Sequence, residues 1–217
     1  MADIRVAVIT GNHPYDIVPF HQLFRSLDGF DCYVQHLEDW ATTAVEERQS
    51  YRVTVFYHMT QETPDPSQSK KLGKTRAAVD SLLDSGQGVL LLHHALLAWP
   101  QWDVWSGVTG INNREFDYHH EQKVLLEPVP DHPITEGLSS WEMMDETYTM
   151  DEPEGVDVLL RTKHTPSMHT LGWAREDGSR RVVCLQSGHD ERCWENLLFR
   201  MLLTQSIRWL AREEDLT

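Results

Sequence analysis

Two histidine-bearing segments are the parts of this sequence best placed to do chemistry. The apolar run Gly88–Leu92 leads directly into His93, and a second run, 182–186, is followed three residues later by His189. In open α/β sheets the carboxyl ends of the strands face the ligand crevice. The sequence therefore predicts that His93 and His189 meet at one sheet edge and act as catalytic acid, base or metal ligand. The alternative is that each only hydrogen-bonds a neighbouring loop.

A group of acidic and phenolic side chains is the next candidate. The run Asp145-Glu146-Thr147-Tyr148 places two carboxylates and a phenol together. Because alternate side chains of an extended segment share a side, Glu146 and Tyr148 are predicted to point the same way. A buried carboxyl can act as acid or base, so Glu146 is a third catalytic candidate and Tyr148 a substrate-binding one. A polar patch between two strands is the alternative interpretation.

Further histidines lie in or beside loops, and several follow predicted strands. They are His13, His58, His119 and His120. Imidazoles that converge on one crevice can bind a transition metal. No HxH or HExxH spacing is present, so we leave open whether a divalent metal such as zinc binds at all. Besides Tyr148, the candidates for substrate binding are His13, His58, His94, His119 and Trp194.

Tryptophan is unusually frequent, with eight in 217 residues, and its flat apolar face suits sugar rings. Trp99, Trp102 and Trp194 lie near the candidate histidines in sequence. We therefore keep sugar stacking as one hypothesis for these three, beside the alternative that they pack in the core.

Strand and helix patterns alternate through the first half of the chain. Strand patterns cover residues 4–9, 31–36, 52–57 and 88–92, and helical periodicity covers 17–27 and 69–85. This order is typical of a parallel doubly wound sheet with helices on both faces. Further strand patterns at 122–129, 156–161, 169–174 and 181–186 precede one long helix at 191–212. We expect one α/β domain over residues 1–217, a three-layer sandwich with a mostly parallel central sheet.

Charge and cysteine usage restrict the possible partners and location. The net charge of −15 repels polyanions, which argues against nucleic acid and anionic membrane surfaces as partners. Three cysteines without metal-type spacing, and a first strand pattern without a signal-peptide segment, indicate a reduced, cytoplasmic protein. No apolar run approaches the roughly 20 residues that a membrane span needs. We expect a homo-oligomer that binds a small-molecule carbohydrate.

Several motifs spread along the chain match one known family. They are Leu171-Gly172-Trp173-Ala174-Arg175, Gly188-His189-Asp190, Trp194-Glu195-Asn196, Phe199, Arg208-Trp209, His93-His94-Ala95, Asp131-His132-Pro133-Ile134-Thr135-Glu136-Gly137-Leu138 and Asp145-Glu146-Thr147-Tyr148. Together they resemble the ThuA-like family, named for trehalose utilisation, over nearly the whole chain. The resemblance implies a class I glutamine amidotransferase-like, flavodoxin-like fold.

One departure from that fold's amidotransferases changes the expected chemistry. Their elbow carries a cysteine, whereas this chain has His93 there, so glutamine hydrolysis through a thioester has no nucleophile. His189 resembles the histidine that partners that cysteine, and Glu191 the acidic residue two positions after it. The resemblance thus implies a retained crevice with different chemistry.

The resemblance also implies a role in the catabolism of trehalose or a related disaccharide. Its substrates would be keto-glycosides made by a partner dehydrogenase, and its reaction an isomerisation or glycosidic elimination assisted by acid, base or metal. Two alternatives stay open: a non-catalytic binding or regulatory subunit with this fold, and hydrolysis through Cys193.

Overall fold

The computed structural model describes residues 3–212, and in that range one sheet runs through the molecule. The strands are β1 (Ile4–Gly11), β2 (Phe30–His36), β3 (Val53–His58), β4 (Gly88–Leu92), β5 (Asp117–Pro128), β6 (Trp141–Thr149), β7 (Asp157–Arg161), β8 (Thr170–Asp177) and β9 (Arg180–Leu185). The helices are α1 (Ile17–Arg25), α2 (Leu37–Thr42), α3 (Val45–Gln49), α4 (Lys70–Asp84), α5 (Asp103–Thr109), α6 (Glu191–Trp194) and α7 (Leu197–Leu210), with short 3-10 helices η1 (His93–Leu97) and η2 (Pro133–Thr135).

The sheet is mixed, which corrects the expectation of a mostly parallel one. The strand order is β2-β1-β3-β4-β9-β8-β7-β5-β6. Pairs from β2 to β9 are parallel, whereas every pair from β9 to β6 is antiparallel. One cause is the two-residue connection between β8 and β9, because a turn that short can join only antiparallel strands. The two residues of that turn, Gly178-Ser179, are a hairpin signal that the alternating pattern concealed.

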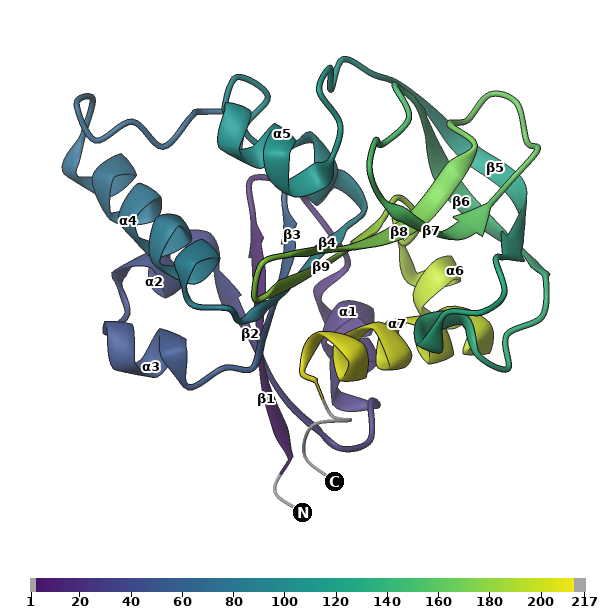
Figure 1. Ribbon diagram of the computed structural model, residues 1–217, viewed down its shortest axis with the longest axis horizontal. Helices are drawn as coiled ribbons and strands as arrows, with labels where there is room; N and C mark the ends of the chain where they lie inside the picture. Colours follow the sequence, from purple (N-terminus) through teal and green to yellow (C-terminus); the bar gives the residue numbers. More distant parts are fainter. Residues whose placement is uncertain (1–2, 213–217) are drawn as a thin grey trace.

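Both faces of the parallel half are buried, as the three-layer expectation requires. On β1, Val6 and Val8 belong to the core beneath α1 and α7, whereas Ala7 and Ile9 belong to the core beneath α2, α4 and α5. Alternate side chains of a strand point to opposite faces, so a continuous apolar run fills two cores. Figure 1 shows α2 and α4 on one side of these strands and α1 with α7 on the other.

One predicted helix is broken in the structure, and one observed helix was not predicted. The expected single helix over 191–212 is broken after α6, because the side chain of Asn196 accepts hydrogen bonds from the backbone of Leu198 and Phe199 and so caps α7. Asp190 caps α6 as predicted. The sequence patterns also missed α5, which begins right after the irregular segment that follows η1.

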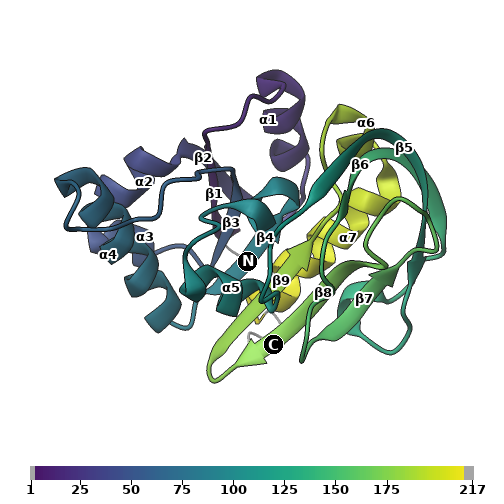
Figure 2. The same ribbon diagram turned by 90° about the horizontal axis from the view of Figure 1, so that it is seen from above.

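The far, antiparallel edge of the sheet supplies one wall of the candidate site. Figure 2 shows β5 and β6 as long curved strands that pass close to α6. Gln186, just beyond β9, donates a 2.9 Å hydrogen bond from its side chain to the carbonyl of Glu146 in β6. The carboxyl ends of β4 and β9 are therefore joined to β6. Within residues 3–212, none of the helices is long and apolar enough to cross a membrane.

Candidate functional site

His93 is the first residue of η1 and lies in the tight turn that follows β4. Its backbone has a φ of +53°, an uncommon conformation for a residue with a side chain, and its side chain is fully buried. Its Nδ1 lies 2.6 Å from the carbonyl oxygen of Gln186. A carbonyl only accepts hydrogen bonds, so Nδ1 carries the proton. The other ring nitrogen, Nε2, faces the site. The predicted elbow geometry is therefore present.

His189 meets His93 from the end of β9. Its Nδ1 lies 3.0 Å from Nε2 of His93. Gly188, with a φ of +117°, provides the turn before it, and the Asp145 carboxylate accepts backbone hydrogen bonds from both Gly188 and His189. Tyr57 donates a 2.7 Å hydrogen bond to the carbonyl of His189. Burial and the neighbouring His93 lower the pKa of His189, so the ring is neutral at pH 7.

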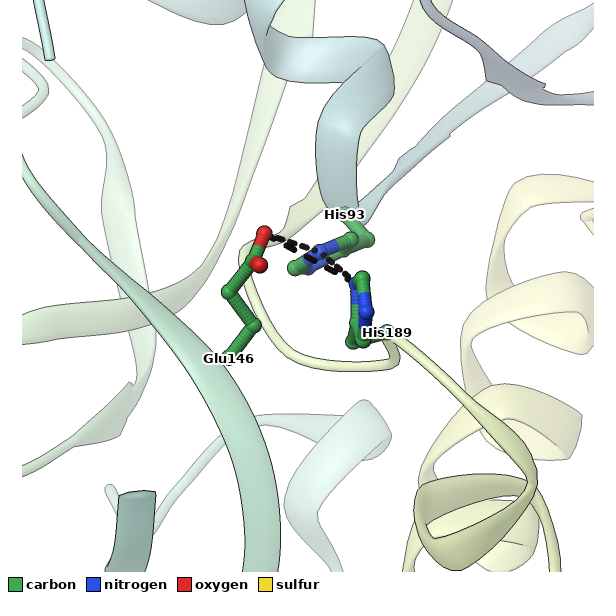
Figure 3. Close-up of side chains that lie close together, drawn as sticks. All are labelled: His93, Glu146 and His189. Atoms are coloured by element: carbon green, nitrogen blue, oxygen red, sulfur yellow. Dashed lines mark hydrogen bonds and ion pairs between the residues drawn. The ribbon is translucent and has the colours of Figure 1, made fainter. Parts of the chain in front are cut away.

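Glu146 and Tyr148 come from β6 and point the same way, as their alternation predicted. The Tyr148 hydroxyl lies 2.6 Å from Nε2 of His93, and Glu146 Oε1 lies 3.4 Å from the same atom (Figure 3). Burial opposes ionisation of Glu146, but the neighbouring imidazoles, His93 first among them, outweigh it and lower its pKa to about 2. Burial raises the pKa of Tyr148 well above its usual range. At neutral pH Glu146 is thus charged and Tyr148 keeps its proton.

His120 completes the cluster, and sequence reasoning noted it only as a loop histidine. Its Nδ1 lies 2.5 Å from Glu146 Oε2. The register of β5 and β6 shifts between His119 and Gln122, where Glu121 has a φ of +53°, and this β-bulge turns His120 toward Glu146. A bulge adds one residue to a strand and so changes which side chains face the site. A strict alternation of side chains along β5 therefore does not predict the contact between His120 and Glu146.

These side chains border a cavity of about 510 Å³. Glu146, Tyr148, His120 and His189 line it, whereas His93 lies behind them. The other lining residues are His13, Pro14, Tyr15, Asp16, Met59, Leu97, Phe116, Tyr118, Asp190 and Trp194. The wall therefore combines aromatic faces with carboxylates and imidazoles.

The remaining predicted substrate-binding residues divide into two groups. His13 and Trp194 line the cavity. His94 is buried behind it, with its ring 4.1 Å from that of His13. His58 is buried among aromatic rings, which lowers its pKa to about 3, and His119 bonds Thr149 Oγ1 at 2.9 Å. The structure does not place these last three on the cavity wall.

The tryptophans and cysteines are mainly structural. Trp99 and Trp102 are buried in the core, whereas Trp194 reaches the cavity and donates a 3.0 Å hydrogen bond to the Gly188 carbonyl. Cys193 is buried, contacts the Met144 carbonyl, and burial raises its pKa. A buried thiol with a raised pKa is a poor nucleophile, so the structure gives no support to hydrolysis through Cys193.

Asp145 is the second residue whose role the sequence did not reveal. Its carboxylate is buried and holds the backbone of the loop that carries His189. The sequence placed it beside Glu146, but alternation directs its side chain away from Glu146, and only the tertiary structure brings that loop to it.

Fold and site together define an α/β protein with a mixed sheet and a histidine at the elbow after β4. The chain belongs to the ThuA family, whose model, described as trehalose utilisation, matches residues 5–210. No curated protein matches the sequence.

Solved structures show the same fold. A ThuA-like protein from Parabacteroides merdae is 17% identical with a TM-score of 0.77, and the alignment covers 97% of this chain and 91% of that one. One from Bacteroides uniformis is 20% identical with a TM-score of 0.71 and coverages of 96% and 92%. A glutamine amidotransferase from Thermotoga maritima is 12% identical with a TM-score of 0.59 and coverages of 97% and 99%.

Proposed function

We propose that this protein is an enzyme acting on a keto derivative of trehalose or a related disaccharide, by proton transfer next to the carbonyl group. Membership of a family described as trehalose utilisation supports the carbohydrate class. The observation that carries the proposal is the cluster of Glu146, Tyr148, His120 and His189 on the wall of one cavity.

The cavity suits a sugar in size and in chemistry. Its volume of about 510 Å³ lies within the range of small-molecule sites. Tyr15 and Tyr118 offer aromatic faces to the C–H side of a sugar ring, and the carboxylates of Asp16 and Asp190 can accept hydrogen bonds from hydroxyl groups. A site built only for an apolar ligand would not need these carboxylates.

Two histidines of the cluster are placed to share the proton transfer. His189 is neutral at pH 7 and can remove the proton from the carbon beside the carbonyl. His120, paired with the charged Glu146, can hold the proton that the leaving glycosidic oxygen takes. In this elimination a C–H bond and a C–O bond break, a C=C bond forms, and the proton ends on the leaving oxygen.

The keto group is essential to this chemistry. An ordinary sugar C–H bond is not acidic, whereas a neighbouring carbonyl stabilises the carbanion as an enolate. The reaction that supplies the substrate is therefore the dehydrogenation of a sugar hydroxyl, which is the role of the expected partner dehydrogenase. Trehalose itself should not react.

The test compares keto-trehalose with trehalose by following their consumption by NMR. We expect turnover of keto-trehalose only, a loss of about 10²–10⁴-fold in Glu146→Gln, and full activity in His169→Gln, an exposed histidine outside the cavity lining. Consumption at equal rates by wild type and Glu146→Gln would contradict the proposal. Tight sugar binding without any turnover would favour the non-catalytic alternative instead.

A further inference from the structure

Three electron-pair donors converge behind the cavity wall. His93 Nε2 lies 3.0 Å from His189 Nδ1 and 3.4 Å from Glu146 Oε1, and the last two atoms are 3.7 Å apart. They come from η1, the loop after β9, and β6, and their side chains point at one another (Figure 3). Among residues 3–212, this is the group of His, Cys, Asp and Glu whose ligand atoms could hold one ion.

The tautomer of His93 leaves its lone pair inside this triangle. Its Nδ1 donates to the Gln186 carbonyl at 2.6 Å, so neutral His93 presents the unprotonated Nε2. Glu146 is an acceptor only, and its Oε1 faces that lone pair. The Tyr148 hydroxyl can donate to Nε2 from 2.6 Å, but it does not lie between Nε2 and Oε1, and a proton or a metal ion there would remove the repulsion between the two lone pairs.

The dimensions fit a metal ion. Nitrogen and oxygen ligands lie about 2.0–2.2 Å from zinc, so two ligands of a tetrahedral ion are about 3.3–3.6 Å apart. The three separations, 3.0, 3.4 and 3.7 Å, bracket that value. Two imidazoles and one carboxylate form a donor set that binds zinc, with the fourth position left for water or substrate.

Each of the three ligands is also held by a second group, as is usual around metal ions. The Gln186 carbonyl orients His93, His120 contacts the other oxygen of Glu146 at 2.5 Å, and Asp145 holds the His189 backbone. A surface cluster of titratable groups would not show such support on every member. We infer that His93, His189 and Glu146 bind one divalent transition-metal ion, of which zinc is the best match.

The ion would face the cavity, because Glu146, His189 and Tyr148 line it while His93 closes the inner side. Resting on the function proposed above, the inference deepens it and changes one role: a neutral His189 that binds the ion through Nδ1 carries its proton on Nε2, so proton removal would pass to His120, which also serves the leaving oxygen. The ion's open position would accept the carbonyl oxygen of a keto sugar and stabilise the enolate charge. With His93 Nε2 engaged by the ion, the Tyr148 hydroxyl, now 2.6 Å from that nitrogen, becomes free to donate to the same oxygen.

Metal binding is measured directly on the protein of residues 1–217. The protein is stripped with a chelator and titrated with cobalt(II), which reports tetrahedral nitrogen–oxygen coordination by its visible absorption, and with zinc by calorimetry. We expect one ion per chain and a higher melting temperature with zinc. The variants His93→Ala, His189→Ala and Glu146→Gln should each lose more affinity than the about 10–100-fold that removal of a group supporting a metal ligand typically costs.

The matched control is His169→Gln, which also removes one histidine and should bind as wild type does. Absence of stoichiometric binding by folded wild-type protein, or binding that the three variants leave unchanged, would overturn the inference. The outcome is distinct from that of the proposed function. Turnover of keto-trehalose by stripped protein refutes only the ion's part in the reaction, and tight metal binding without turnover refutes only the reaction.

Discussion

Nε2 of His93 lies 3.0 Å from Nδ1 of His189, although the two residues are 96 positions apart in the sequence. One follows β4 and the other follows β9, and these strands are parallel neighbours. The pair therefore exists because two adjacent strands end at the same edge of the sheet, where α/β proteins place their ligands.

The β-bulge in β5 yields a test with two adjacent histidines. His120→Gln removes the partner of Glu146 and should lower kcat/KM for keto-trehalose by about 10²-fold or more, because the proton donor is lost. His119→Gln should have little effect, because that side chain bonds Thr149 instead of facing the cavity. Steady-state kinetics of both variants decides, and a larger loss in His119→Gln would contradict the observed register.

The turn before His189 should tolerate only glycine. A Cβ at Gly188 would lie 2.9 Å from Phe199 Cζ and 3.0 Å from Leu92 Cδ1, at a φ of +117°. We expect Gly188→Ala to lower the free energy of unfolding by more than the about 1–2 kcal/mol that a left-handed backbone alone costs, and to reduce activity. The loop that positions His189 would have to move.

Gly178→Ala provides the matched control for that variant. Gly178 has a φ of +60° in the β8–β9 turn, and a Cβ there would meet nothing within 4 Å. Its destabilisation should be limited to the backbone term, with kinetics unchanged. Urea unfolding of the two variants measures the difference, and equal losses would show that the contacts around Gly188 are not tight.

Burial of His58 should make the fold sensitive to acid. Burial lowers its pKa from 6.5 to about 3 in the folded protein, so between these values only the unfolded chain takes up the proton. The contribution of neutral, buried His58 to the free energy of unfolding is fully present above pH 6.5. It is lost as the pH falls toward 3, by up to about 1.4 kcal/mol per pH unit.

The variant His58→Asn checks this assignment. Asparagine can still accept the hydrogen bond that Thr60 N donates to Nδ1, but it does not titrate. It should be less stable at pH 7, because its smaller side chain leaves a void between Phe56 and Trp99. Its stability should nevertheless depend less on pH between 6.5 and 4. Parallel pH profiles for wild type and variant would show that other groups control acid unfolding.

The sequence was sufficient to predict the parallel half of the fold and the histidine pair. Apolar strands such as Gly88–Leu92 and the residues just beyond them follow from periodicity and strand-end position. The antiparallel half was not predictable in the same way, because strand patterns do not encode direction. Its one local signal was the Gly178-Ser179 turn.

The wall that β6 contributes to the site depended on long-range pairing. Alternation correctly put Glu146 and Tyr148 on one side, but nothing local showed that this side would face His93. The bulge that aims His120 breaks alternation, and the burial of His58 beside Trp99 is a packing outcome. Strand-end position alone therefore identified more ligand candidates than the cavity contains.

The most direct test of the proposed chemistry is deuterium uptake from D₂O into keto-trehalose, followed by proton NMR. Removal of a proton beside the carbonyl by His189 predicts that wild-type protein exchanges that hydrogen, in the remaining substrate or in the product, while His169→Gln does the same. Exchange should be lost in His189→Gln and Glu146→Gln, and trehalose should take up no deuterium. Exchange at the wild-type rate in folded His189→Gln and Glu146→Gln would contradict the account.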